Sequence, residues 1–236
     1  MKDRYTYPGE ELAFFEKAIH WKSYFASHIK PFTGKNVLEV GSGIGATTSL
    51  LNDGSATKWN LLEPDETMCA VLKEKISKQP QFSNCTIYNN TIFELNADQK
   101  FDTIIYIDVL EHIENDKEEM ARAATLLENG GHLIILSPAY NFLFSPFDKA
   151  IGHYRRYTNA SLKKAMPEEL QQVKMNYLDS VGFFASLANK IMLKQSYPSE
   201  KQIRLWDRWM IPVSKWTDKI FLHSFGKSIL GVWRKR

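Results

Sequence analysis

Short apolar runs alternate with amphipathic segments along the first 140 residues of the chain. The apolar runs predict β-strands at 36–40, 59–62, 86–88, 103–107 and 132–136, and a later run predicts a last strand at 228–233. Apolar residues at helical spacing predict helices at 9–30, 46–51 and 117–128, and from Pro64 through Ile76. This alternation predicts an α/β fold in which parallel βαβ units carry helices on both faces of the sheet.

Polar residues stand where these predicted strands end. Glu39 through Gly45 lie at or just past the end of the first strand, and Glu63, Thr91, Asp108 and Ser137 lie at or just past the ends of the next four. Ligands of parallel α/β sheets bind outside the carboxyl ends of the strands. The pattern therefore predicts a ligand-binding site at this edge of the sheet.

The last third of the chain has a different pattern. Residues 138–170 combine aromatic and basic residues with little periodicity, and residues 203–222 predict an amphipathic helical stretch that is broken at Pro212. The length of 236 residues, with 44% hydrophobic and 24% charged residues, fits one globular domain and is short for two. We find no internal repeat and no linker composition that would mark a boundary.

Charge and cysteine content narrow the cellular setting. The formal charge of +3 is a mild excess that does not by itself indicate nucleic-acid binding. Cys69 and Cys85 form neither a CxxC pair nor a zinc pattern, which fits a reducing compartment. No apolar run approaches the roughly 18 residues that span a bilayer, and the first residues carry no signal segment. We therefore expect a cytoplasmic protein.

A glycine-rich loop follows the first predicted strand and opens a helix. Gly41 and Gly43 have no side chains, so a ligand can lie against the backbone there. The spacing is GxGxG rather than the GxGxxG of dinucleotide sites, and the acidic Glu39 precedes it. A carboxylate at this place favours a cationic ligand such as S-adenosylmethionine, which carries a sulfonium and an ammonium group. The alternative is a plain strand-to-helix turn that needs glycine.

Glu63 strengthens the cofactor hypothesis. It closes the second predicted strand, 20 positions after Gly43. A carboxylate at this position can accept hydrogen bonds from both hydroxyls of a ribose, as it does in dinucleotide folds. The alternative is a charge at the end of a strand that faces water.

These motifs together resemble the class I methyltransferases. Residues 37–45 (VLEVGSGIG) are similar to the first motif of that family, and residues 62–65 (LEPD) are similar to its second acidic motif. Residues 101–113 and 127–133 resemble its fourth strand and the turn into its fifth. The resemblance covers about residues 32–140. It implies a Rossmann-like, doubly wound, mostly parallel seven-stranded sheet with a helical C-terminal cap, and S-adenosylmethionine as the cofactor.

The resemblance also implies roles for single residues and for the parts of the domain. The implied cofactor-binding residues are Glu39, Gly41, Ser42, Gly43 and Gly45 at the methionine part, Glu63 and Pro64 at the ribose, Thr91 and Ile92 at the adenine, and Asp108 and Val109 at the sulfonium. One departure is Asn90–Thr91, where many relatives have an aspartate. We expect an N-terminal helix (1–31), a cofactor-binding core (32–140), a lid and cap (141–227), and a last strand with a basic end (228–236).

His112 is the first candidate for a general base, because it follows the fourth strand beside the implied sulfonium site and imidazole titrates near neutral pH. The alternative is a structural histidine at the start of a helix. Asp108, Glu111 and His112 are also similar to the metal-binding ExxEH of certain RNA-end and quinone O-methyltransferases. Asp108 replaces the longer glutamate, and the further ligand would have to be His132 or His153. We therefore favour a site without a metal.

Residues 145–158 (SPFDKAIGHYRRYT) are similar to a loop of an uncharacterised methyltransferase subgroup that is often linked with sugar or lipid pathways. His153, Tyr154, Arg155 and Tyr157 suit a lid over an acidic or aromatic substrate, and we take His153 and Tyr154 as further catalytic candidates. The alternative is a solvated connector whose aromatic residues pack on the core.

The C-terminal part places tryptophans among basic residues. Our first interpretation is a helical cap whose tryptophans fill the substrate pocket or a dimer contact. Peripheral membrane contact comes second and nucleic acid third, because the basic residues are not dense enough.

The chain is thus predicted to methylate an oxygen atom of a small-molecule, sugar or lipid-linked acceptor. A nucleic-acid methyltransferase and a non-catalytic binding module stay as alternatives, and a nicotinamide reductase is disfavoured by the glycine spacing. The acceptor, the methylated atom and the oligomeric state do not follow from the sequence.

Overall fold

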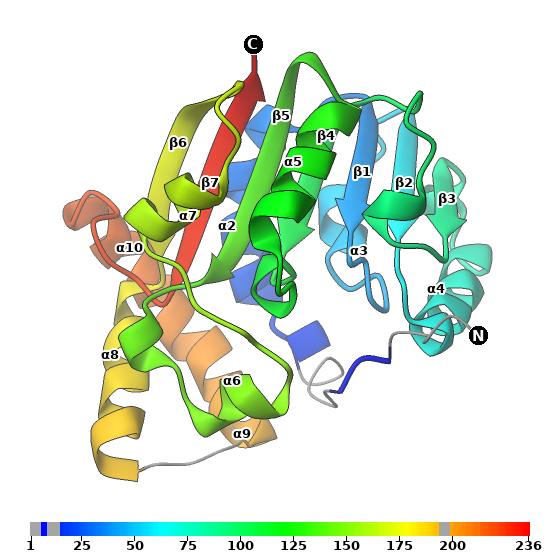
Figure 1. Cartoon of the computed structure of the whole chain (residues 1–236). Coiled ribbons are helices and arrows are strands. Elements are labelled where there is room, and N and C mark those ends of the chain that lie inside the picture. Colours follow the sequence, from blue (N-terminus) through cyan, green and yellow to red (C-terminus); the bar gives the residue numbers. More distant parts are fainter. Residues whose placement is uncertain (1–5, 9–14, 194–198) are drawn as a thin grey trace.

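A computed structural model describes residues 6–8, 15–193 and 199–236. A seven-stranded sheet with the strand order β3-β2-β1-β4-β5-β7-β6 forms its centre (Figure 1). The strands are β1 (Asn36–Val40), β2 (Lys58–Leu62), β3 (Cys85–Tyr88), β4 (Phe101–Ile107), β5 (Leu127–Pro138), β6 (Leu170–Leu178) and β7 (Ser228–Lys235). The first five are parallel, and β7 lies antiparallel between β5 and β6. The predicted fold class is confirmed.

Helices cover both faces of the sheet. They are α2 (Ile19–Ile29), α3 (Thr48–Leu51), α4 (Glu66–Ser77), α5 (Asp116–Leu126), α6 (Pro146–Ala150), α7 (Asn159–Ala165), α8 (Ser180–Ala188), α9 (Glu200–Leu205) and α10 (Ile211–Ile220). Short 3₁₀ turns are η1 (Lys30–Phe32), η2 (Pro80–Phe82), η3 (Ile92–Glu94), η4 (Leu110–His112) and η5 (Asn141–Leu143), and η6 (Asn189–Leu193) and η7 (Trp206–Met210) are π-helical. In Figure 1, α5 and α7 lie in front of the sheet, and α2 lies behind it.

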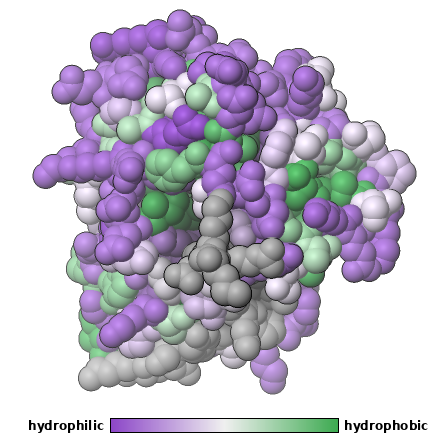
Figure 2. Space-filling model, turned by 45° about the vertical axis from the view of Figure 1, so that its right-hand side comes forward, coloured by the Kyte–Doolittle hydropathy of each residue, from purple (hydrophilic) through white to green (hydrophobic). Residues whose placement is uncertain are grey.

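Alternation along the strands divides the core into two layers. In β5, Leu133 and Ile135 pack with α5 and α7, while Ile134 and Leu136 pack with α2 and the C-terminal helices. All four residues are fully buried. This is why residues 133–136 of β5 form an unbroken apolar run: a strand that is buried on both faces needs apolar side chains on both. On the outside, hydrophilic side chains cover most of the face in Figure 2, and apolar surface is exposed only in patches. No helix in the described part of the chain is long and apolar enough to cross a membrane.

Several predicted elements need correction. The β6 strand was not predicted, because it is an edge strand with mostly half-buried or exposed positions and has no apolar run. The predicted helix 117–128 ends at Leu126, because β5 begins at Leu127, and Gly130, whose φ is 80°, lies within that strand. Of the helix predicted at 9–30, residues 9–14 lie outside the described residues, and the regular helix begins at Ile19.

The helical stretch of the cap is not broken at Pro212. The elements α9, η7 and α10 follow one another without a gap from Glu200 to Ile220, and Pro212 stands in the first turn of α10. Proline removes a backbone donor and crowds the preceding turn of a helix. The π-helical turn of η7 lies directly before α10, and proline is tolerated in the first turn of a helix, where no intrahelical donor is needed.

Buried carboxylates join the cap to the sheet. The Asp218 side chain in α10 is fully buried and accepts hydrogen bonds from the Tyr24 hydroxyl at 2.8 Å and from the backbone N–H groups of Asp179 and Ser180 at 2.7 and 2.8 Å. Asp179 has a φ of 66°, and its own side chain accepts hydrogen bonds from the Trp206 indole and the Ser214 hydroxyl, both at 2.7 Å. These hydrogen bonds connect α2, the end of β6, η7 and α10.

We expect Asp218→Ala to lower the free energy of unfolding by about 3 kcal/mol, because three buried donors lose their acceptor. Urea unfolding followed by circular dichroism measures this change. Asp98→Ala, at an exposed aspartate before β4, is the matched control and should stay within about 0.5 kcal/mol of wild type. Equal stabilities of the two variants would show that Asp218 does not hold the cap.

Candidate active site

A cavity of about 1020 Å³ opens at the carboxyl ends of β1, β2 and β4. The glycine loop after β1 forms one side of it, and residues of α6, α8, α9 and η7 form the opposite side. Of the residues predicted to form the site, the cavity is lined by Gly41, Ser42, Gly43, Glu63, Pro64, Thr91, Ile92, Asp108, Val109, His112, His153 and Tyr154. Glu39 and Gly45 are not among the lining residues. The ends of the parallel strands thus bring together residues that are far apart in the sequence.

The glycine loop requires glycine for two reasons. Gly41 and Gly43 have φ angles of 65° and 53°, in the left-handed region that L side chains rarely adopt. A Cβ atom on Gly41 would also lie 2.5 Å from a methyl group of Val109, which follows β4. The backbone of the loop therefore lies directly against the end of β4. The Ser42 hydroxyl beside it is buried and has no hydrogen-bond partner among the described residues.

Glu63 is tied to the glycine loop. One carboxylate oxygen accepts the Gly43 N–H at 2.7 Å, and the other accepts the Asp65 N–H at 2.9 Å. Burial raises the pKa of Glu63, and these two hydrogen bonds act against the rise. Each carboxylate oxygen has a second lone pair, so Glu63 keeps acceptor capacity for a ligand in the cavity.

Glu39 lies beneath the loop rather than in the cavity wall. It is 3% exposed, and its Oε2 accepts hydrogen bonds from the Trp59 indole at 2.7 Å and the Thr48 hydroxyl at 2.9 Å. Burial raises its pKa to about 7 in spite of these donors. In this structure Glu39 supports the turn between β1 and α3.

The hydrogen-bonding groups of Thr91 are partly used within its own turn. It caps η3, where its backbone N–H and its hydroxyl both donate to the Glu94 carboxylate, at 2.8 and 3.2 Å. Ile92 is 1% exposed and offers an apolar surface. The wall predicted for the adenine is therefore mainly apolar here.

Asp108 holds a strained backbone conformation at the end of β4. Its φ is 53°, which is uncommon for a residue other than glycine, and its N–H donates to the Leu136 carbonyl at 2.8 Å. Such strain persists at sites where the surrounding structure enforces it, and it is frequent at functional sites. The side chain is exposed to the cavity, and burial among protein atoms raises its pKa to about 6 against the effect of His153 and Lys227.

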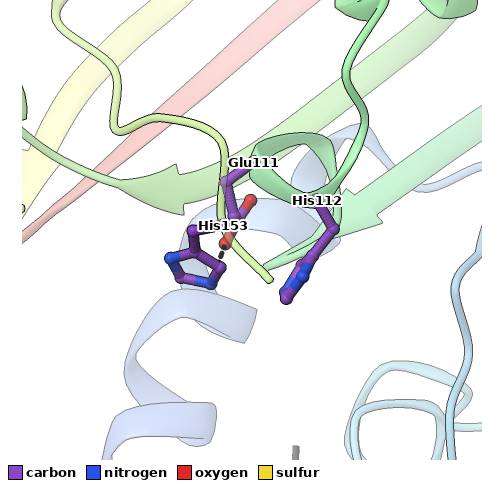
Figure 3. Close-up of side chains that lie close together, drawn as sticks. All are labelled: Glu111, His112 and His153. Atoms are coloured by element: carbon purple, nitrogen blue, oxygen red, sulfur yellow. Dashed lines mark ion pairs between the residues drawn. The ribbon is translucent and has the colours of Figure 1, made fainter. Parts of the chain in front are cut away.

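Glu111, His112 and His153 lie close together in this wall (Figure 3). Glu111 is fully buried, its Oε2 accepts the Ser137 hydroxyl at 2.5 Å, and its Oε1 lies 3.9 Å from His153 Nε2. The rings of His112 and His153 meet edge to face, with their centroids 4.5 Å apart. Burial, with a further contribution from Asp108, raises the pKa of Glu111 well above its usual value.

The two histidines differ in their suitability as bases. Burial and the neighbouring His153 lower the pKa of His112 to about 3, so its imidazole is a weak proton acceptor. His153 Nδ1 lies 2.9 Å from Asp148 Oδ1, a contact that places the proton on Nδ1 and the lone pair on Nε2. The geometry therefore favours His153 over His112 as a base.

Asp148 and Arg156 complete this arrangement, and the sequence analysis gave neither of them a role. Arg156 donates from Nε and Nη2 to the two oxygens of Asp148 at 2.8 and 2.9 Å. Burial alone would raise the pKa of Asp148, but its contacts with His153 and Arg156 bring it well below the usual value. A sequence signal existed in Ser145–Asp148, which forms the capping box of α6 and fixes Asp148 at the cavity.

The segment predicted as a lid is held in place by ion pairs. Arg155 pairs with Asp116 at 2.7 Å, and the buried Tyr157 donates its hydroxyl to the same carboxylate at 2.9 Å. Neither side chain lines the cavity. Tyr154 does line it and is 53% exposed. The segment thus forms a wall of the cavity, and Arg155 and Tyr157 hold it to Asp116. That it moves as a lid stays a prediction.

Glu111, His112 and His153 are also a group that could hold a metal ion, since their ligand atoms lie within 4.8 Å of one another. Glu111 Oε1 and His112 Nδ1 have no hydrogen-bond partner in the described part of the chain. The group differs from the one considered from sequence. Asp108 is not part of it, and His132 pairs with Thr103 near the start of β4, away from the cavity.

Comparison with known proteins identifies the family. A family model described as a methyltransferase domain matches residues 12–187. The chain is 26% identical over 122 residues to the mitochondrial ubiquinone biosynthesis O-methyltransferase of Dictyostelium discoideum, which covers 48% of this chain and 38% of that protein. It is 27% identical over 161 residues to the demethylmenaquinone methyltransferase of Tropheryma whipplei, covering 67% and 63%. The chain spans less than two thirds of the length of these curated relatives.

Solved structures show the same fold. The N-methyltransferase NodS from Bradyrhizobium japonicum matches with a TM-score of 0.57 at 15% identity, over 95% of this chain and 98% of that one. A complex of the Haloferax volcanii Trm112 methyltransferase activator with a methyltransferase matches with a TM-score of 0.66 at 12% identity, over 96% and 94%. At these identities the likeness concerns the fold alone.

The lowered pKa of His112 gives a prediction for acid stability. Its folded-state pKa of about 3 lies below the ordinary 6.5, so the unfolded chain binds a proton that the folded protein rejects. The stability that this neutral histidine contributes is fully present above pH 6.5 and is lost as the pH falls toward 3. The unfolding free energy of His112→Gln should fall less steeply than that of wild type over this range, by about 1.4 kcal/mol per pH unit.

Urea unfolding at a series of pH values measures this difference in slope. His20→Gln, at an exposed histidine of α2, is the matched control and should run parallel to wild type. Parallel curves for His112→Gln as well would contradict a neutral His112.

Proposed function

The chain belongs to the methyltransferase domain family, and from that premise we propose that it methylates a hydroxyl oxygen of a small-molecule, sugar or lipid-linked acceptor. S-adenosylmethionine is the methyl donor of this family. The relative from D. discoideum is named an O-methyltransferase, and a second NodS structure, 16% identical with a TM-score of 0.58, holds S-adenosyl-L-homocysteine. The first name supports transfer to oxygen, and the second supports the cofactor alone, because NodS is an N-methyltransferase.

The half of the cavity at the glycine loop suits the cofactor. Gly41 exposes its backbone beside Val109, and the Ser42 hydroxyl, which has no partner among the described residues, is available as a donor or acceptor. Glu63 has acceptor capacity for ribose hydroxyls, and Ile92 offers an apolar surface for a base. We assign cofactor binding to the predicted residues that line the cavity, with Glu39 and Gly45 as supports of the loop. The assigned residues are Gly41, Ser42, Gly43, Glu63, Pro64, Thr91, Ile92, Asp108 and Val109.

The opposite half suits an acceptor with an apolar or aromatic part. Its lining residues include Trp21, Phe25, Phe147, Trp206 and Met210. A cavity of about 1020 Å³ exceeds the space that one drug-sized ligand needs, so it leaves room for an acceptor beside the cofactor. The apolar walls also exclude water, which would compete with the acceptor for the methyl group.

The Asp148–His153 pair carries the assignment to oxygen. S-adenosylmethionine supplies an electrophilic methyl group, and a hydroxyl attacks it well only as its proton leaves. With its Nδ1 proton held by Asp148, His153 presents the Nε2 lone pair and can take that proton. Arg156 keeps Asp148 ionised, and the ionised Asp148 stabilises the imidazolium that forms. Tyr154 lies on the same wall and can position the acceptor.

Cofactor binding is the first expected result. Calorimetric titration should show heat with S-adenosylmethionine and none with NADPH. Gly41→Ala should weaken binding about tenfold or more, because the added Cβ meets Val109 and strains the left-handed backbone. Gly54→Ala, at a glycine with φ of 85° and no neighbour within 4 Å, is the control and should bind as wild type. Absence of heat with S-adenosylmethionine for wild type would refute the cofactor assignment.

The acceptor atom is tested by the release of S-adenosylhomocysteine with phenols, sugars, polyprenols and amines as candidate acceptors. Hydroxyl acceptors should be turned over, and methylation confined to amines would refute transfer to oxygen. With an active acceptor, His153→Gln should lower kcat about a hundredfold or more and leave the affinity for S-adenosylmethionine unchanged. His132→Gln, outside the cavity, is the matched control.

Divalent ions separate the two possible roles of His153. An imidazole base needs no ion, so dialysis against EDTA should leave turnover unchanged. A loss of turnover that Mg²⁺ or Zn²⁺ restores would instead assign Glu111, His112 and His153 to a metal site, and would overturn the base assignment.

A further inference from the structure

An apolar stripe runs along the outer side of the C-terminal helices. It consists of Leu205, Trp209, Val213, Trp216 and Ile220, whose side chains are 52%, 65%, 51%, 75% and 71% exposed. Val213, Trp216 and Ile220 are three or four positions apart and lie on one side of α10, and Leu205 and Trp209 precede them in the continuous helical run from α9 through α10. Phe221 and Leu222, at 48% and 85% exposure, extend it past the end of α10.

This stripe is unusual for a protein surface. Of the fifteen large hydrophobic side chains that are exposed in the described part of the chain, seven fall within residues 205–222. Single exposed apolar residues are ordinary, but a continuous apolar surface marks a binding site. The opposite side of the same helical run is buried through Ile203, Trp206 and Ile211. Packing against the protein's own core therefore does not account for the outer stripe.

Basic residues stand next to the stripe in the sequence. Arg204, Arg208, Lys215 and Lys219 each directly precede a residue of the stripe, and the Arg208 guanidinium lies 5.7 Å from the centre of the Trp209 ring. Three of these four basic residues are exposed, and Lys215 is half-buried over Tyr24.

The acidic residues of this stretch are turned away from the stripe. Asp207 and Asp218 are 6% and 0% exposed and hold the cap together through hydrogen bonds. Glu200, at the start of α9, is paired with Lys17 and Arg204. The outer face therefore presents apolar side chains flanked by positive charge, which is the pattern of a helix that lies in the surface of a bilayer.

We propose that the face formed by residues 204–222 docks on an anionic lipid bilayer, with the apolar stripe in the interface and the flanking cations against lipid phosphates. Charge complementarity selects this occupant: a second copy of the chain would bring the same cations against one another, whereas an anionic membrane attracts them. Tryptophan is favoured at the boundary between headgroups and acyl chains. Leu205 also lines the cavity, so the docked helices would form the membrane side of the cavity wall.

The test is cosedimentation of the 236-residue chain with lipid vesicles. Binding is expected to vesicles of phosphatidylcholine with about 25% phosphatidylglycerol, with much weaker binding to pure phosphatidylcholine and a clear loss in about 0.5 M KCl. Trp209→Ser with Trp216→Ser should abolish binding. Val71→Ser with Val173→Ser, at valines 46% and 47% exposed on α4 and β6, is the control for exposed apolar residues and should bind as wild type.

A second pair of variants tests the charges. Arg208→Gln with Lys219→Gln should weaken binding to the anionic vesicles about thirtyfold. Lys58→Gln with Lys117→Gln changes the net charge equally at exposed lysines of β2 and α5 and should have a much smaller effect. Circular dichroism melting and binding of S-adenosylmethionine confirm that each variant is folded.

Three results would overturn the proposal. The first is wild-type protein that does not bind the anionic vesicles. The second is the tryptophan variant binding them as wild type does, and the third is a charge variant indistinguishable from its control. A concentration-dependent dimer in light scattering that the tryptophan variant abolishes, together with no vesicle binding, would assign the face to a second copy of the chain.

Discussion

The cavity depends on a backbone contact between the loop after β1 and the residues after β4. Gly41 lies so close to Val109 that no side chain fits between them, and the left-handed φ of Asp108 turns the chain at the same place. Two parallel strands with ordinary side chains at their ends would have to splay apart there. The contact allows both loops to turn away from the sheet edge and leaves backbone groups facing the space between them. Glu63, at the end of β2, accepts a hydrogen bond from the Gly43 N–H and so fixes the position of the glycine loop.

A second constraint comes from charge that is buried on the side of the cavity opposite the glycine loop. Asp148 is 1% exposed, and a buried carboxylate without partners would be costly. Its two oxygens instead accept hydrogen bonds from the side chains of Arg156, His153 and Ser145, which all lie in the segment 145–156. The segment after β5 therefore gains a fixed shape although it contains little regular structure. The same contacts that stabilise the wall also hold the imidazole of His153 at the cavity.

The sequence predicted the parts of the fold in which local pattern and tertiary packing agree. The four inner parallel strands β1, β2, β4 and β5 are mostly buried, so they appear as apolar runs, whereas the edge strand β3 is only half-buried. The glycine loop is recognisable because both its conformation and its close packing require glycine. The edge strand β6 lacks that signal, since water and β7 supply most of its surroundings. The sequence also does not show that His153 is better suited as a base than His112. That difference depends on the burial of His112 and on the contact of His153 with Asp148, which lies five positions before it across a turn.

The cap shows a third limit of sequence patterns, because its tryptophans do not share one role. Trp206 is 9% exposed and donates its indole N–H to Asp179, which is the packing role expected for tryptophans in a cap. Trp209, only three positions later, lies 65% exposed on the opposite side of the same helical run. The π-helical turn at η7 changes the angular spacing at this point, so the sides cannot be assigned by counting residues alone. Asp207 and Asp218 are buried and hold the helical run to the core through hydrogen bonds, while the apolar side chains of the stripe lie exposed on its outer side.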